Sequence, residues 1–196
     1  MFDEYKVDLP EGRAGQWQVS KFVVDDAASR FTSLRAALKG RGYLPPGTYT
    51  QLTRGETIVM SDTPDEIKDH LAFIYRAHGI CLINGLGLDM AATAALRKPN
   101  VAHVYVVEQS ADVISLVAPT YKKNYSDRLT VLHGDALTDK WPELRGVRFD
   151  AVWHDIWDTI CGDNLPEMTK LHRRYARRCN WQGSWARALC RRGCRR

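Results

Sequence analysis

Between residues 63 and 178, the pattern of apolar and polar residues predicts strands that alternate with helices along the chain. Short apolar runs predict four strands, at residues 80–84, 102–108, 128–133 and 149–154. Helical segments are expected at residues 88–98, 110–122 and 165–178, with a loop or short helix at 136–146. Such an alternation is typical of a parallel sheet with right-handed crossovers. We therefore predict an α/β fold with a mostly parallel sheet.

The helix that precedes this unit has a clear start in the sequence. Thr63 stands where an N-cap is expected, Pro64 occupies the first helical position, and Glu66 completes a capping box. Gly79 is expected to end the helix.

The first 61 residues predict a small α+β appendage. We expect an irregular arm at 1–16, a strand at 17–24, a helix at 27–39 and a hairpin with strands 48–52 and 56–60. Phe31, Leu34 and Leu38 recur at helical spacing within the predicted helix.

The composition is that of an ordinary globular chain, with 44% hydrophobic and 26% charged residues among 196. No apolar run reaches the roughly 20 residues of a membrane span, and residues 1–6 lack a signal pattern. We therefore expect a cytoplasmic protein that does not contact a membrane, and its five cysteines are expected to be reduced.

Charge is distributed unevenly along the chain. Residues 168–196 contain one lysine, nine arginines and no acidic residue, a formal charge of +10, whereas the remainder holds 18 basic and 23 acidic residues, a charge of −5. Trp181 and Trp185 interleave with these arginines, and a short helix is expected within 181–192. Guanidinium and indole groups suit nucleic acid, so we expect polyanion contact, with an acidic partner protein or the chain's own acidic body as alternatives.

The candidate chemistry begins at the end of the first core strand. Gly85 and Gly87 form a turn between a buried strand and an Ala-rich helix, which lets backbone approach a ligand closely or simply serves the fold. Glu108 ends the second strand, 21 positions after Gly87, where a carboxylate can accept hydrogen bonds from ribose hydroxyls or remain solvated. Dinucleotide binding also fits Glu108, but the Gly-x-Gly-x-x-Gly spacing is missing.

Two later strand ends carry further acids. Asp135, after the third strand, is either a ligand contact or a turn residue. His154, Asp155 and Asp158 follow the fourth strand, at the edge where open α/β sheets bind ligands. We expect these three as catalytic residues, with a carboxylate that orients or deprotonates an amine. Trp153 and Trp157 are expected either to wall the site or to serve as a core residue and an edge cover, respectively.

With these residues in order, segment 63–178 resembles the first part of a class I S-adenosylmethionine-dependent methyltransferase, with a two-part layout similar to that of spermidine synthases and a shortened C-terminus. The resemblance implies a Rossmann-like domain at 62–178, between the appendage at 1–61 and a basic tail at 179–196. It also implies a sheet order of about 3-2-1-4, which the tail either extends or leaves unchanged. It implies S-adenosylmethionine as cofactor. The cofactor contacts that it implies are Asn84, Gly85, Gly87, Asp89, Glu108, Gln109, Gly134, Asp135 and Ala136.

The resemblance leaves three functions open. The first is methyl transfer to an amine of a small molecule or a nucleic acid, the second is aminopropyl transfer to a polyamine, and the third is a non-catalytic nucleic-acid-binding or assembly module. Zinc binding by His172, Cys179, Cys190 and Cys194 is disfavoured, because the cysteines lack a paired C-x-x-C spacing.

Overall fold

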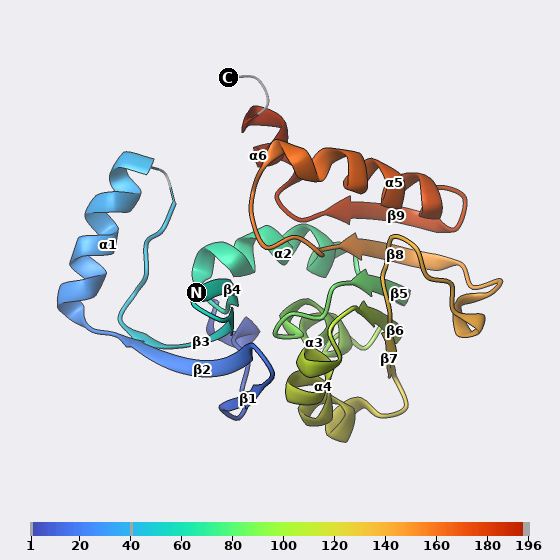
Figure 1. Cartoon of the computed structure of the whole chain (residues 1–196), viewed down its shortest axis with the longest axis horizontal. Helices are drawn as coiled ribbons and strands as arrows, with labels where there is room; N and C mark the ends of the chain where they lie inside the picture. Colours follow the sequence, from blue (N-terminus) through green and yellow to red (C-terminus); the bar gives the residue numbers. More distant parts are fainter. Residues whose placement is uncertain (1, 40, 194–196) are drawn as a thin grey trace.

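The structure, a computed structural model, describes residues 2–39 and 41–193 and contains two β-sheets (Figure 1). The larger sheet has the order β7-β6-β5-β8-β9, and all its strands run parallel. Its strands are β5 (Gly79–Asn84), β6 (Val101–Glu108), β7 (Leu129–His133), β8 (Phe149–His154) and β9 (Cys179–Ser184). The predicted α/β class and the 3-2-1-4 order are confirmed, and β9 extends the sheet.

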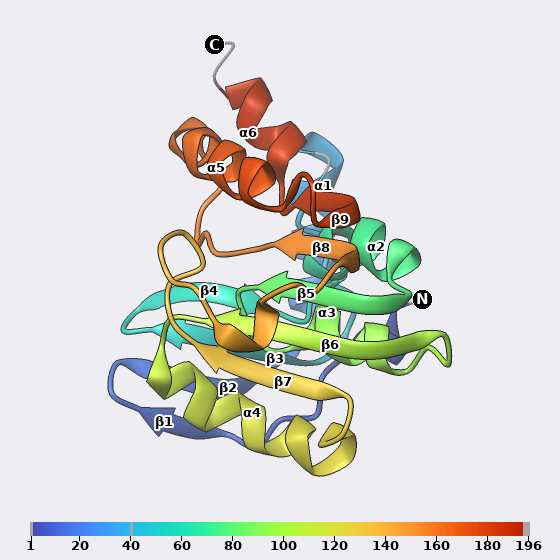
Figure 2. The ribbon, with the colours of Figure 1, turned by 90° about the vertical axis from the view of Figure 1, so that its right-hand side faces the viewer.

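Helices cover both faces of this sheet (Figure 2). Its helices are α2 (Pro64–Arg76), α3 (Met90–Leu96), α4 (Ala111–Tyr125), α5 (Leu165–Tyr175) and α6 (Arg187–Gly193). Ile83 and its same-face neighbours form one buried cluster with α2, α3 and α4, whereas Leu82 packs toward α5 in a second cluster. No helix in the described part of the chain combines the length and apolar character needed to cross a bilayer.

The predicted basic tail begins with a strand of the main sheet. Residues 179–184 form β9 beside β8, and the helix expected within 181–192 starts only at Arg187. Trp181 lies in the strand, where its ring stacks on that of Trp153 at a centroid separation of 6.3 Å. Residues 179–184 contain no arginine, and pairing with the otherwise open edge of β8 together with aromatic stacking places them in the sheet.

The N-terminal residues form a four-stranded antiparallel sheet of order β1-β2-β3-β4. Its elements are β1 (Gly12–Ala14), β2 (Trp17–Val24), α1 (Asp26–Lys39), β3 (Gly47–Arg54) and β4 (Thr57–Ser61). The arm expected at 1–16 therefore contains a strand, which packs with β2 against α4. A short 3-10 helix, η1 (Asp3–Tyr5), precedes it, and two more, η2 (Pro142–Leu144) and η3 (Gly162–Asn164), lie in the loops around β8.

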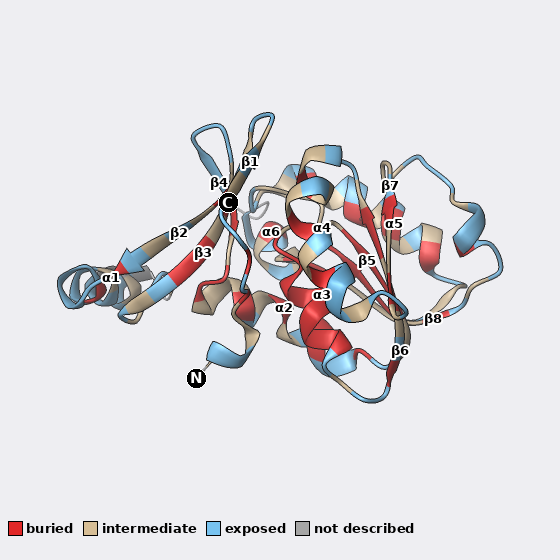
Figure 3. Ribbon diagram, turned by 90° about the horizontal axis from the view of Figure 1, so that it is seen from below, coloured by how far each residue is buried: buried red, intermediate tan, exposed pale blue. Residues whose placement is uncertain are grey.

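Helix α1 stands away from the body at the end of β2 (Figures 1 and 3). Its predicted apolar residues Phe31, Leu34 and Leu38 are 63%, 67% and 83% exposed. The helical spacing is thus present, but this stripe lies outside the core.

Helix α2 starts at Pro64 as predicted, but the capping box is wrong. Thr63 makes no side-chain cap, and its hydroxyl instead lies 3.0 Å from the hydroxyl of Ser61 at the end of β4. Glu66 does not return to the helix terminus but lines the cavity described below. The chain leaving β4 therefore fixes the entry to α2, and a carboxylate becomes available to the site.

Candidate functional site

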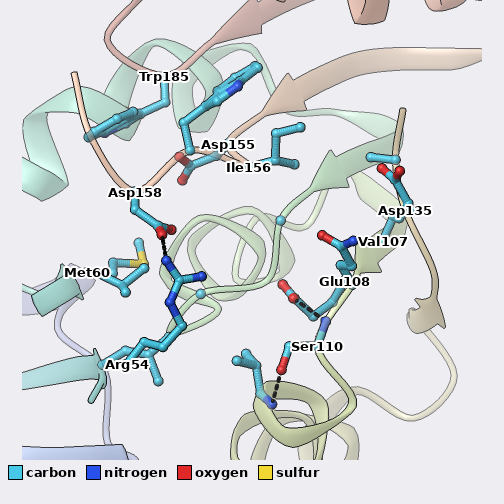
Figure 4. Close-up of a pocket in the computed structure, with 18 of the residues that line it drawn as sticks. Arg54, Met60, Val107, Glu108, Ser110, Asp135, Asp155, Ile156, Asp158 and Trp185 are labelled. Atoms are coloured by element: carbon cyan, nitrogen blue, oxygen red, sulfur yellow. Dashed lines mark hydrogen bonds and ion pairs between the residues drawn. The ribbon is translucent and has the colours of Figure 1, made fainter. Parts of the chain in front are cut away.

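A cavity of about 530 Å³ lies at the carboxyl ends of β5, β6, β7 and β8. Figure 4 shows Glu108 and Asp135 on one side of it and Arg54, Met60 and Asp158 on the other. The small sheet thus closes one side, and the main sheet supplies the rest. Nine of the twelve predicted site residues line the cavity: Gly85, Gly87, Glu108, Gln109, Gly134, Asp135, Ala136, Asp155 and Asp158.

The glycine turn after β5 is required by the packing of the chain itself. Gly85 has φ +101°, and a Cβ there would collide with the carbonyl oxygen of Asp155. Gly87 has φ +52°, and a Cβ there would collide with the sulfur of Met60. Both positions favour glycine, so the loop can lie against β4 and the end of β8 while its backbone faces the cavity.

Glu108 is fixed at the end of β6 by two backbone amides. Its Oε2 accepts from Leu86 N at 2.9 Å and its Oε1 from Ser110 N at 2.8 Å. Each carboxylate oxygen has two lone pairs, so each keeps one for a ligand hydroxyl. Burial raises the pKa of the Glu108 carboxyl, and the two amides oppose that rise.

Asp135 lines the cavity and also builds the turn after β7. Its Oδ1 accepts from Leu137 N at 2.8 Å and its Oδ2 from the Thr138 hydroxyl at 2.9 Å. Its own amide donates to Asp139 Oδ2 at 2.8 Å. The turn role is therefore present, and one lone pair on each oxygen is left for a ligand.

Two carboxylates after β8 face the cavity together with Glu66 from α2. Asp158 forms an ion pair with Arg54 from β3 at 2.5 Å, and the Asp155 side chain is 17% exposed. Burial, reinforced by the charge of Glu66 and further nearby carboxylates, raises the pKa of Asp155 well above its usual range. Burial likewise raises the pKa of Glu66 to about 7. These acids hold protons more tightly than exposed ones, and a cationic ligand beside them would relieve the repulsion among their ionised forms.

Three predicted site residues are buried and do not line the cavity. His154 points toward α5, where its ring lies 5.6 Å from that of Tyr175, and burial lowers its pKa to about 3. Asn84 Nδ2 donates to His154 Nδ1 at 2.8 Å. Asp89, left-handed at φ 61°, accepts from the Thr93 hydroxyl at 3.4 Å. The alternation of side chains along a strand explains why His154 and Asp155 face different surroundings.

The sequence did not reveal His70, which lies behind Asp155. Trp153 Nε1 donates to His70 Nδ1 at 3.2 Å, so the proton of the neutral ring resides on Nε2. Burial lowers the pKa of His70 to about 4 and keeps the ring neutral. Nε2 has no hydrogen-bond partner among the described residues and lies 3.6 Å from Asp155 Oδ2. His70 is therefore placed to donate to Asp155 after a small movement.

Aromatic side chains form part of the cavity wall. Trp157 lines it and donates to Glu167 Oε2 at 2.7 Å, whereas Trp153 is a buried core residue that does not line it. Trp185 also lines it and is 6% exposed. Of the two tail indoles, Trp185 is thus buried in the fold, and Trp181 is partly buried with its ring stacked on that of Trp153.

The described residues among those considered for zinc, His172, Cys179 and Cys190, do not form a metal site. Within residues 2–39 and 41–193, no three His, Cys, Asp or Glu side chains converge on a metal-sized site. His172 Nε2 instead lies 2.8 Å from the Ser184 hydroxyl, and Cys194 lies outside the described residues.

Comparisons with known proteins identify no family for the chain. No protein-family model matches it, and no curated protein does either. Solved structures similar to it include a dimethyladenosine transferase from Plasmodium falciparum, with 20% identity, a TM-score of 0.43, and coverage of 57% of this chain and 37% of that one.

Two further structures are similar at the same level. A Staphylococcus aureus protein provisionally assigned as a caffeoyl-CoA O-methyltransferase has 10% identity, a TM-score of 0.47, and coverage of 78% of this chain and 62% of that one. The CcbJ methyltransferase from Streptomyces caelestis has 15% identity, a TM-score of 0.45, and coverage of 60% and 46%. The chain spans less than two thirds of the length of each of these three proteins.

Proposed function

We propose that the cavity binds S-adenosylmethionine and that the chain transfers its methyl group to an amine of a small molecule or a nucleic acid. The observation that carries the proposal is the convergence of Gly85, Glu108, Asp135 and Asp155, from four strand ends, on one cavity. Its volume of about 530 Å³ lies within the roughly 300–1,000 Å³ of small-molecule sites.

The donor set fits this cofactor. Glu108 is oriented by two amides and has lone pairs left for the ribose hydroxyls. The turn at 134–137 lines the adjoining part of the cavity, where Asp135 would accept from the adenine amino group. Arg54 is the only cation among the described lining residues and would pair with the cofactor's carboxylate, although it must share its charge with Asp158.

Acidic residues dominate the lining and favour cationic ligands. The acidic lining residues are Glu66, Glu108, Asp135, Asp155, Asp158 and Glu167. When bound, S-adenosylmethionine supplies a methyl group on a sulfonium for direct displacement. An acceptor ammonium must lose a proton before it attacks, and a carboxylate with a raised pKa is the better base for that step.

We assign Asp155 as the base that accepts this proton. His70 acts as a positioning residue behind Asp155. The His70 N–H faces Asp155 Oδ2 and would fix the orientation of the carboxylate. Trp157 and Trp185 line the cavity and would limit the access of water to the acceptor nitrogen. Most of the expected acceleration comes from alignment of the two reactants.

Calorimetric titration with S-adenosylmethionine, combined with mass spectrometry of methylated amines, tests the proposal. We expect binding to the wild type and at least tenfold weaker binding to Glu108→Gln, because an amide cannot accept from both backbone N–H groups and two ribose hydroxyls. Glu143→Gln, an exposed control outside the cavity, should bind normally. The absence of heat for the folded wild type at millimolar ligand would refute the proposal.

The acidity of the cavity favours one alternative, aminopropyl transfer to a polyamine. Asp155 and Asp158 would then hold a diamine, and the cofactor would be the decarboxylated form. The two reactions differ at Arg54, since only the intact cofactor has a carboxylate for it. Arg54→Gln should weaken the intact cofactor at least tenfold and leave the decarboxylated one unchanged, with Arg13→Gln as an exposed control. Tighter wild-type binding of the decarboxylated cofactor would favour the alternative.

A further inference from the structure

A second cavity, of about 380 Å³, lies between the loop around η2 and helix α5. It shares no lining residue with the candidate active site. We call it the Trp141 pocket. Its lining residues are Lys140, Trp141, Pro142, Leu144, Arg145, Arg174, Tyr175 and Arg178.

The Trp141 pocket carries positive charge that the protein does not neutralise. Lys140, Arg145, Arg174 and Arg178 line it, and no acidic residue does. None of the four forms an ion pair with any carboxylate in the described chain. The pocket therefore has the opposite charge from the active-site cavity and favours an anion.

Two of these cations have fixed positions. Arg174 Nη1 donates to Ala136 O at 2.6 Å, and Arg178 donates to Leu144 O. The Arg174 guanidinium lies 5.7 Å from the centroid of the Trp141 ring and 5.9 Å from that of Tyr175. These bonds and contacts hold flat guanidinium groups against aromatic rings.

The tryptophan is also anchored. Trp141 Nε1 donates to His133 O at 3.2 Å, and the side chain is partly exposed. The exposed Lys140 and Arg145 stand on either side of it in the sequence. A preorganised flat surface beside freely reorienting cations is what base stacking together with phosphate contact requires.

Positive charge continues beyond the cavity. Arg148 Nη1 donates to Arg177 O at 3.1 Å, which places a further exposed cation beside the end of α5. Neither Arg148 nor Arg177 has an ion-pair partner within the described residues. A single phosphate could not contact all of these cations, whereas a nucleic-acid strand carries a phosphate at every nucleotide.

We propose that the Trp141 pocket binds one nucleotide of a single-stranded nucleic acid. A base stacks on the surface formed by Trp141 and Arg174, and Lys140 and Arg145 contact its phosphates. The neighbouring nucleotides run past Arg148 and Arg177. This site does not depend on the proposed methyl transfer, since the two cavities are separate.

Fluorescence anisotropy with a labelled 12-nucleotide single strand, measured over a salt series, tests the proposal. The double variant Lys140→Gln/Arg145→Gln should bind at least tenfold more weakly, with a salt slope smaller by about 1–2. Trp141→Leu should bind about 5- to 100-fold more weakly with an unchanged slope, because it loses stacking only. Since Trp141 also packs against Arg174, its folding is checked by thermal melting.

The matched control removes two exposed lysines from another face. Lys122→Gln/Lys123→Gln, in α4, should retain most of the affinity. An equal loss in the two double variants would show nonspecific attraction and overturn the proposal. Competition by a mononucleotide as effective as that by the strand would overturn the assignment to a strand. Binding of S-adenosylmethionine should be unchanged in Lys140→Gln/Arg145→Gln, which keeps the two proposals distinguishable.

Discussion

Glu66 provides a quantitative test of the electrostatics of the candidate active site. Its carboxyl lines the cavity, and burial raises its pKa from 4.5 to about 7. A group whose pKa is higher in the folded state binds its proton more tightly there. Stability is therefore lost as the pH rises from about 4.5 to about 7 and stays level above that range.

The size of this loss follows from the pKa. Each pKa unit corresponds to about 1.4 kcal/mol, so the full rise corresponds to about 3 kcal/mol. Because the Glu66 side chain is only partly shielded from solvent, we expect about 1–3 kcal/mol. Glu66→Gln removes the titration and keeps the shape, so the free energy of unfolding of the variant relative to the wild type should rise by that amount between pH 4.5 and pH 8.

Urea unfolding of the wild type and of Glu66→Gln at pH 4.5, 6, 7 and 8 measures this difference. Glu143→Gln, at an exposed glutamate in η2, is the matched control for the loss of a carboxylate outside the cavity. A pH-independent difference for Glu66→Gln would refute the reasoning. A cationic ligand bound beside Glu66 should lower its pKa and reduce the dependence on pH.

Three further predictions concern the framework of the site. Gly85→Ala should lower the free energy of unfolding by more than about 2 kcal/mol, because the new Cβ would collide with backbone atoms. Gly146→Ala, also at positive φ but with open space around the Cβ, should lower it by less in the same urea assay. His70→Leu leaves the indole N–H of Trp153 unpaired and should lower the free energy of unfolding by about 1–3 kcal/mol. An unchanged urea midpoint for this variant would contradict the prediction. Asp62→Ala removes the acceptor of two buried amides and should lower stability by about 2 kcal/mol or more; a shift in Tm under 1 °C would contradict this.

The sequence predicted the main sheet because the information there is local. Each core strand is a short apolar run that ends beside a glycine or an acid, so the strands and the position of Glu108 followed from the pattern. The strand order followed from the family resemblance. Strand β9 could not be predicted this way. Its place depends on the open edge of β8 and on stacking of Trp181, which are properties of the assembled fold.

The predicted site residues follow from local sequence pattern, whereas the missed ones depend on how the elements pack together. Asp155 follows a predicted strand directly, whereas Glu66 and Arg54 reach the cavity from elements whose packing no local pattern specifies. His70 lies in a helix stripe and is distinguished only by Trp153 and Asp155 around it. His154 was placed wrongly because alternation along β8 sends its side chain to the opposite face.

The crystal structure of the protein with S-adenosylhomocysteine tests the central claim most directly. We predict that both ribose hydroxyls lie within hydrogen-bond distance of Glu108, that the adenine lies against the turn at 134–137, and that the sulfur faces Asp155. A ligand bound elsewhere, or held without contact to Glu108, would contradict the assignment of this cavity.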